Sequence, residues 1–150
     1  SGMNLLLLSF RVRNVISQQD GVKAAYFGFL DRYRALPGDY SQATANIPNC
    51  ATCQNGDNNG QILLFGAILE SISAWEHLSK AGFITGSYVY NATAASTNTP
   101  VNPYGVLVQL IYDTAYQDGA TATGPIRHNL KTGNNIPARI PKANHTGSPA

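Results

Sequence analysis

The sequence has few charged side chains and little that points to a nucleic-acid or membrane partner. Charged residues make up 12% of the 150 residues, roughly half the usual share, and the formal net charge is only +2. Lys and Arg are scattered rather than gathered in a basic stripe, so no nucleic-acid partner is expected. The longest purely aliphatic run, Leu5 to Leu8, is far shorter than the ~20 residues that cross a bilayer. No transmembrane segment is therefore predicted.

A hydrophobic share of 43% over 150 residues is enough for one folded domain with a buried core. We expect a single domain over 1–150, ending in a loosely ordered polar tail over 141–150. Ser1 and Gly2, ahead of Met3, are typical of residues added for expression. A native segment upstream of Met3 is therefore expected to be missing from this sequence.

Cysteine is scarce, with only Cys50 and Cys53 in a C-A-T-C arrangement inside a loop rich in Pro, Asn and Gly. Such a pair can form a disulfide, remain as free thiols or supply half of a metal site. A tetrahedral zinc site needs four ligands, and the three histidines are isolated from one another. A structural disulfide is the favoured interpretation, in keeping with a protein outside the cytoplasm.

Two segments have the apolar periodicity of helices. The first covers about 10–36 and ends at Pro37 and Gly38, because the residue before proline is biased away from helical geometry. Its apolar stripe contains Val15, Val22, Tyr26, Phe29, Leu30 and Tyr33. The second covers about 62–81, with a stripe of Leu64, Ile68, Ile72, Trp75 and Leu78.

Local signals around these helices suggest how they begin and end. Asp39 with Gln42 has the spacing of a capping box for a short helix, so Asp39 is interpreted as a helix cap. Glu76 and Lys80 are spaced for a weak ion pair on the second helix. Gly82 is placed for a left-handed C-terminal cap. Trp75 is interpreted as a core residue.

The second half of the chain changes to the period of two that is typical of strands, predicted at 87–91, 105–112 and 125–130. Helices followed by strands favour the α+β class with an antiparallel sheet. The predicted fold is a long N-terminal helix packed on that sheet, with a second helix in the connecting region. The sheet is expected to bury the stripe that contains Val22, Tyr26, Phe29 and Tyr33.

Four motifs occur in the order found in a known protein family. They are YRALPGD at 33–39, NGDNNGQI at 55–62, AWEHL at 74–78 and AGFITGSY at 81–88, with a weaker fifth, LKTGNNIP, at 130–137. The arrangement resembles the type IV pilins and the type II secretion pseudopilins, which are made as precursors with a prepilin-type cleavage and methylation segment. The resemblance covers about 26–90 closely and the rest of the chain loosely. Within these motifs, the residues interpreted as structural are Pro37, Gly38, Asp39, Trp75 and Gly82.

The resemblance implies a non-enzymatic subunit of a type IV pilus, a fimbrium, or of the pseudopilus that serves protein transport. In the family, a hydrophobic N-terminal segment spans the bacterial inner membrane before assembly and forms the filament core afterwards. The implied partners are other pilin or pseudopilin subunits and, through the missing segment, the membrane. The head is then expected in the periplasm before assembly and in a cell-surface or periplasmic filament afterwards, with no small-molecule substrate.

This sequence departs from the family pattern at both ends. The hydrophobic N-terminal segment, with its cleavage glycine and the glutamate that follows, does not occur here, which we attribute to truncation. Members of this subgroup tend to end in an acidic segment after the Ile-Pro motif, whereas 141–150 reads PKANHTGSPA and has no carboxylate side chain. A role for that acidic segment is therefore not carried over to this chain.

The loop at 55–60 matches the first half of a calcium-binding loop, in which alternate side chains converge on the cation. Position twelve, where a bidentate glutamate belongs, is Gly66, and Glu70 one helical turn later could substitute. The candidate Ca²⁺ ligands are Asn55, Asp57, Asn59, Gln61 and Glu70. The alternative is that Asn-Gly-Asp-Asn-Asn-Gly simply forms a turn.

Nothing in the sequence is arranged for catalysis. No G-x-S-x-G elbow, P-loop or H-E-x-x-H is present. His77 shares a helix face only with Glu70 and is interpreted as a packing or hydrogen-bonding residue rather than a general base. The alternative to a filament subunit is a secreted, calcium-stapled binding or adhesive module that acts through its surface loops.

Overall fold

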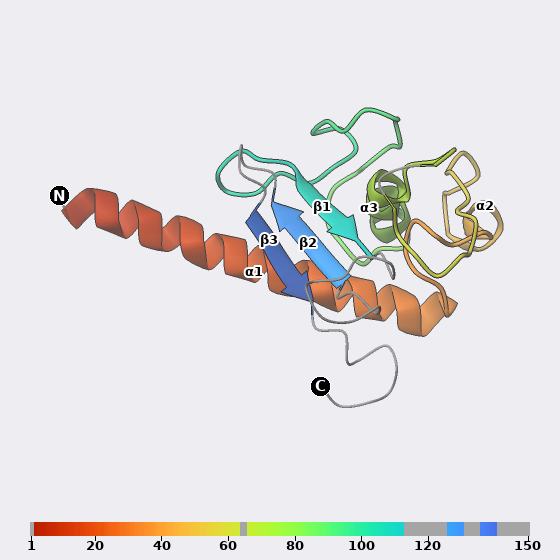
Figure 1. The fold of residues 1–150 in the computed structure, drawn as a ribbon, viewed down its shortest axis with the longest axis horizontal. Helices are drawn as coiled ribbons and strands as arrows, with labels where there is room; N and C mark the ends of the chain where they lie inside the picture. Colours follow the sequence, from red (N-terminus) through yellow and green to blue (C-terminus); the bar gives the residue numbers. More distant parts are fainter. Residues whose placement is uncertain (1, 64–65, 113–125, 131–135, 141–150) are drawn as a thin grey trace.

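A computed structural model of the protein describes residues 2–63, 66–112, 126–130 and 136–140, the last two segments as backbone. This part of the chain is mostly helical (Figure 1). Helix α1 spans Gly2–Tyr33, α2 spans Ala43–Asn46 and α3 spans Glu70–Lys80. The strands are β1 (Val108–Ile111), β2 (Ile126–Leu130) and β3 (Ile136–Ile140).

Helix α1 begins earlier and ends earlier than the predicted helix over 10–36. The residues from Gly2 onward join it because Leu and Met are strong helix formers. It ends at Tyr33, since Arg34 has a left-handed φ of 54°. Ala35 and Leu36 then turn into the core ahead of Pro37, where the backbone is biased away from the helix.

The second predicted helix, over 62–81, is wrong in its first eight residues, because α3 begins only at Glu70. Ile62 instead exchanges two backbone hydrogen bonds with Tyr112, at 2.7 and 3.1 Å. Gly66 has a φ of +121°, which a right-handed helix does not accommodate. Of the predicted stripe, Ile72, Trp75 and Leu78 are buried on α3, Ile68 precedes the helix, and Leu64 lies outside the described residues.

The predicted glycine cap of α3 is confirmed. Gly82 has a φ of +82°, the Phe83 N–H donates to the Leu78 carbonyl at 2.9 Å, and the Gly82 N–H donates to the Ser79 carbonyl at 3.1 Å. These two bonds define a Schellman motif, which satisfies the last carbonyls of the helix. The cap also directs Phe83 toward α1, where its ring centroid lies 6.2 Å from that of Phe29.

The predicted role of Asp39 as a helix cap is wrong. Helix α2 begins at Ala43, four residues beyond Asp39, and its N-cap residue Gln42 makes no side-chain cap hydrogen bond. The Asp39 carboxylate instead accepts backbone hydrogen bonds from Asn59 and Gly60. The first-turn amide of Thr44 in α2 donates to the Asn55 side chain instead.

No strand forms at 87–91, contrary to the prediction. The Tyr90 N–H, which a strand would use for pairing, donates to the buried Glu76 carboxylate at 2.9 Å. The same contact explains why the predicted Glu76–Lys80 ion pair does not occur, because the Glu76 side chain turns inward from α3. One contact between residues fourteen positions apart therefore overrides both local predictions.

Strands β1 and β2 lie within the predicted ranges 105–112 and 125–130, and β3 was not predicted. The three pair antiparallel in the order β1-β2-β3, with Leu110 opposite His128 and His128 opposite Ala138. Strand β3 contains Pro137, which lacks an N–H, and it pairs with β2 alone. Proline is tolerated on such an edge strand. The predicted tail at 141–150 lies outside the described residues.

The predicted α+β fold class, with a sheet packed on the first helix, is wrong. The described chain is mostly helical, and β1 is its one short strand with side chains placed. The α1 stripe of Val22, Tyr26 and Phe29 is covered by α3 and neighbouring loops instead of by strands. The ring of Phe29 lies 6.1 Å from the rings of both Tyr40 and His77.

Helix α3 is the centre of the core. It contacts both α1 and β1, and its residues from Glu70 to Leu78 are buried. Trp75 is fully buried, as predicted for a core residue. A helix with this much buried surface can cover α1 more completely than a short strand can, because apolar burial dominates the free energy of packing.

Candidate functional site

The turn at 37–39 and the loop at 55–60 meet at the first turn of α3. Asp39 is 2% exposed, and its two carboxylate oxygens accept hydrogen bonds from the Asn59 N–H at 2.8 Å and the Gly60 N–H at 2.9 Å. Its own carbonyl accepts the Asn58 N–H at 2.9 Å. The loop therefore wraps around Asp39 through three successive backbone groups.

Glycines make this close approach possible. Gly38 has a φ of +86°, and a Cβ at this position would lie 2.3 Å from the Glu70 carbonyl oxygen. A Cβ on Gly56 would lie 2.2 Å from the Asp39 carbonyl carbon. Backbone thus packs directly on backbone at both contacts, which explains why the Pro-Gly-Asp and Asn-Gly-Asp sequences are both needed here.

Three carboxylates converge at this junction. Carboxylate oxygens of Asp39, Asp57 and Glu70 all lie within 4.8 Å of one another. The Asp57 N–H donates to Glu70 Oε1 at 3.3 Å, and the Asp57 carboxylate accepts from the Asn59 backbone and side chain. Asp39 and Glu70 are buried and Asp57 is exposed, so the cluster opens to solvent on the Asp57 side. We call these three residues the carboxylate cluster.

Burial and mutual repulsion hold protons on this cluster. Desolvation raises the pKa of Asp39 to about 6, against the opposing hydrogen bonds from Gly60 and Asn59. Desolvation, together with the smaller effect of the charges of Asp39 and Asp57, likewise raises the pKa of Glu70 to about 7. Close carboxylates in this state favour either a shared proton or a cation with oxygen ligands, such as Ca²⁺.

The structure brings together part of the predicted calcium set. Asp57 and Glu70 belong to the carboxylate cluster, and Asn55 and Asn59 line the same hollow of about 120 Å³. The Asn55 side chain is already bonded to Thr44, and Asn59 Oδ1 accepts the Gln61 N–H. Gln61 does not line the hollow.

Asp39 is the residue that the predicted calcium set lacked. Its place at the end of the Leu-Pro-Gly-Asp motif was a signal that could have identified it. The spacing to Gln42 instead led to its interpretation as the cap of a short helix.

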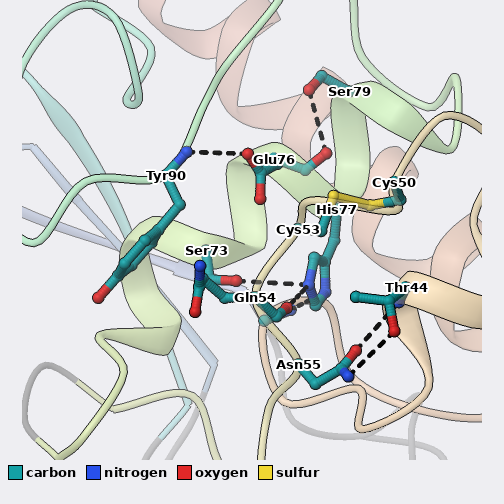
Figure 2. The surroundings of a disulfide bond; sticks show 11 residues. Thr44, Cys50, Cys53, Gln54, Asn55, Ser73, Glu76, His77, Ser79 and Tyr90 are labelled. Atoms are coloured by element: carbon teal, nitrogen blue, oxygen red, sulfur yellow. Dashed lines mark hydrogen bonds between the residues drawn. A yellow bond between two sulfur atoms is a disulfide. The ribbon is translucent and has the colours of Figure 1, made fainter.

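His77 joins three segments in the core beside the carboxylate cluster. It is fully buried, and its Nδ1 accepts the Gly38 N–H at 2.9 Å, which places the ring proton on Nε2. Nε2 then donates to the Gln54 carbonyl at 2.7 Å, with the Ser73 hydroxyl 3.3 Å away (Figure 2). Burial lowers the pKa of His77 to about 4. The prediction of a hydrogen-bonding histidine is confirmed.

A disulfide joins Cys50 to Cys53 directly before Gln54 (Figure 2). Both cysteines are buried, and the Cys53 N–H donates to the Cys50 carbonyl at 2.9 Å. The disulfide closes the turn that presents the Gln54 carbonyl to His77. It therefore supports the loop that carries Asn55 and Asp57, and the structure places it as a structural element of the junction.

The first half of α1 lies apart from this junction and projects beyond the rest of the described chain (Figure 1). Its apolar side chains are exposed, Leu5 by 70% and Leu6 by 61%. The full set is Met3, Leu5, Leu6, Leu7, Leu8, Phe10, Val12 and Ile16. We call the segment 3–16 the apolar arm. Among the described helices, none has both the length and the hydropathy for a membrane span.

No protein family, curated protein or solved structure matches this chain. The features of the chain that bear on its function are the carboxylate cluster with its junction, the apolar arm and the motif resemblance.

Proposed function

We propose that this chain is a non-enzymatic structural subunit of a bacterial filament of the type IV pilus or type II secretion pseudopilus kind. In this proposal the apolar arm packs among the first helices of other subunits, and the body that contains α3 is carried outside them. Before assembly, the body faces the periplasm and the protein is held at the inner membrane. After assembly, it lies in a cell-surface or periplasmic filament.

The apolar arm is the observation that carries this proposal. At 100° per residue, the exposed apolar side chains between Met3 and Phe10 lie on every side of α1, so no single flat partner covers them. A helix that is apolar all round is normally buried on all sides, and monomeric proteins rarely expose apolar patches of such extent. Several copies of the same helix around each arm satisfy this requirement, and repeated head-to-tail contacts between copies generate a filament.

The junction around His77 supports a structural role rather than catalysis. Both ring nitrogens of His77 are used in contacts to backbone groups, and the ring is fully buried. The Asp39 carboxylate likewise holds the backbone of Asn59 and Gly60. These groups connect the YRALPGD, NGDNNGQI and AWEHL motifs into one rigid body, which is what a repeated filament subunit needs.

The intact mass and N-terminal sequence of the native protein test this proposal. We expect the protein in sheared filaments or in the inner-membrane fraction of its source, extended upstream by a hydrophobic segment of ~20 or more residues with a methylated first residue. A native chain that starts near Met3 and is recovered only in the soluble fraction would contradict the proposal. That result would favour the adhesive or binding module.

The alternative, a calcium-stapled binding or adhesive module, is favoured by the carboxylate cluster. The three converging carboxylates make no ion pair with a basic side chain in the described part of the chain, so they repel one another once all are ionised. A bound Ca²⁺ would remove this repulsion and tie the 37–39 turn, the 55–60 loop and α3 together. The calcium site stays a prediction, with Asp39 now added to Asp57 and Glu70.

Calcium is expected to raise the melting temperature at pH 8, where the pKa values of Asp39 and Glu70 leave both carboxyls ionised. At a concentration well above Kd, the rise should be roughly 5 °C for a domain of this size. Differential scanning calorimetry with 5 mM Ca²⁺ or with EDTA measures it. Asp39→Asn should abolish the rise, whereas the exposed Asp20→Asn should keep it. An unchanged melting temperature in EDTA excludes the staple.

A further inference from the structure

The chain contains two Asn-Gly dipeptides, Asn55-Gly56 and Asn59-Gly60, and both lie in the 55–60 loop. Asparagine before glycine is prone to deamidation, because no Cβ hinders the attack of the glycine nitrogen on the side-chain carbonyl carbon of the asparagine. The attack closes a succinimide ring and releases ammonia, and water then opens the ring to aspartate or isoaspartate. The fold gives the two dipeptides different surroundings, so they are not expected to react alike.

The dipeptide Asn55-Gly56 is half-buried and held by neighbouring groups. Asn55 Oδ1 accepts the Thr44 N–H at 3.0 Å, and Asn55 Nδ2 donates to Thr44 Oγ1 at 3.1 Å. The Gly56 N–H donates to the Tyr40 carbonyl at 2.9 Å, and a neutral carbonyl does not take the proton away. A Cβ on Gly56 would lie 2.2 Å from the backbone of Asp39, so the chain has little room to rearrange. Asn55 is therefore protected.

The dipeptide Asn59-Gly60 is exposed and has a base at its nitrogen. Nothing lies within 4 Å of the position of a Cβ on Gly60. The Gly60 N–H donates to Asp39 Oδ2 at 2.9 Å, and a carboxylate, unlike a carbonyl, can accept this proton as a general base. The other oxygen of Asp39 accepts the Asn59 N–H at 2.8 Å, which fixes the carboxylate against the dipeptide.

The Asn59 side chain is bonded in the sense that favours attack. Its Oδ1 accepts the Gln61 N–H at 2.9 Å, an Asx-turn that folds the side-chain carbonyl back over the Gly60 peptide. Negative charge develops on this oxygen during the attack, and the backbone N–H stabilises it. Its Nδ2, the leaving nitrogen, donates to Asp57 Oδ2 at 3.0 Å. The nucleophile, the developing oxyanion and the leaving group therefore each have a partner in place.

We propose that Asn59 is a self-modification site, at which the folded protein converts its own asparagine to aspartate or isoaspartate. The Gly60 nitrogen bonds to Asn59 Cγ, and its proton passes to Asp39. The Cγ–Nδ2 bond breaks, and Nδ2 leaves as ammonia with a proton returned by Asp39 and Asp57, whose carboxylate oxygens lie within 4.8 Å of one another. Water then opens the succinimide, so the net reaction consumes one water and releases one ammonia.

The product alters the contact between the 55–60 loop and the 37–39 turn. An aspartate at position 59 replaces the amide that donates to Asp57 with a carboxylate, so repulsion takes the place of a hydrogen bond. Isoaspartate also lengthens the main chain before Gly60 by one carbon, which draws the Gly60 N–H away from Asp39. The modification therefore loosens this contact irreversibly and adds one negative charge to each converted chain.

Comparison with an unfolded peptide tests this proposal. The purified protein and a synthetic peptide of residues 54–63 are incubated in EDTA at neutral pH and 37 °C, and the conversion of each asparagine is followed by peptide mapping and mass spectrometry. We expect Asn59 to convert at least about tenfold faster in the folded protein than in the peptide. Asn55 should convert more slowly in the protein than in the peptide. A rate at Asn59 equal to or below that of the peptide overturns the proposal, because the fold would then not promote the reaction.

Two variants isolate the contribution of the base. Asp39→Asn should lower the rate at Asn59 by about tenfold or more, whereas Asp20→Asn, which removes an exposed carboxylate on α1, should leave the rate unchanged. Asn55 reports on the fold of the loop in the same sample, since it is protected only while its contacts hold. Protection of Asn55 in Asp39→Asn together with an unchanged rate at Asn59 overturns the role of Asp39. If the variant opens the loop, both asparagines should fall in with the peptide rates, which supports a reaction promoted by the folded junction.

Discussion

Gly38→Ala is expected to lower the free energy of unfolding by about 3 kcal/mol or more. The added Cβ would lie 2.3 Å from the Glu70 carbonyl oxygen and 3.1 Å from the Ala74 nitrogen, and both belong to the backbone of α3. Neither can rotate away as a side chain could. The φ of +86° adds about 1–2 kcal/mol of strain for an L-residue. Urea unfolding monitored by tryptophan fluorescence measures the change.

Gly82→Ala is the matched control for this prediction. Its φ of +82° is almost the same, but nothing lies within 4 Å of the position of the added Cβ. The variant should lose only the conformational part, about 1 kcal/mol. Equal losses at Gly38 and Gly82 would show that the turn at Gly38 can move away from α3, and would contradict the close backbone contact on which the junction depends.

His77→Leu is expected to destabilise the protein by about 3–5 kcal/mol, because it leaves one buried and one partly buried backbone group without partners. These are the Gly38 N–H and the Gln54 carbonyl, 2.9 and 2.7 Å from the two ring nitrogens. Leucine nearly fills the volume, so lost hydrogen bonds rather than a cavity dominate the loss. In the control Ser73→Ala, a hydroxyl 3.3 Å from Nε2 is removed and both backbone contacts remain. This control should lose less than about 1 kcal/mol.

The contribution of His77 to the free energy of unfolding is also expected to depend on pH. Burial lowers its pKa from 6.5 to about 4, so the unfolded chain binds the proton more readily than the folded protein does. The contribution is therefore complete above pH 6.5 and is lost as pH falls toward 4, by about 3 kcal/mol in total.

Asp39 and Glu70 act in the opposite sense, because their pKa values are raised to about 6 and 7 and they favour the folded state as pH falls. Both carboxyls are present in the wild type and in His77→Leu. Subtracting the unfolding free energies of the two proteins at each pH therefore removes their contribution and leaves that of His77. A difference that stays constant from pH 7 to pH 4 would contradict the assignment of a neutral, buried His77.

Local signals succeeded where one residue's own backbone preference decides the structure, and failed where a distant partner does. The glycine cap at Gly82 depends on a backbone conformation that glycine adopts at little cost, and it was predicted correctly. The strand predicted at 87–91 failed because Tyr90 is bonded to Glu76, fourteen residues away. The assignment of Asp39 as a cap is wrong for the same reason, since its true partners, Asn59 and Gly60, are 20 and 21 residues further along the chain.

By itself, the sequence determined which segments are apolar, that α1 is a long helix with a buried stripe, that Trp75 belongs to the core and that Asp57 and Glu70 are candidate ligands. Periodicity and capping act within one or two turns, so these features can be recognised locally. Only the tertiary structure decided that α3 rather than a sheet covers α1, and that Asp39 completes the carboxylate cluster. Both results depend on contacts between segments distant in sequence, where the buried groups of one segment must match those of another, and no local pattern records that match.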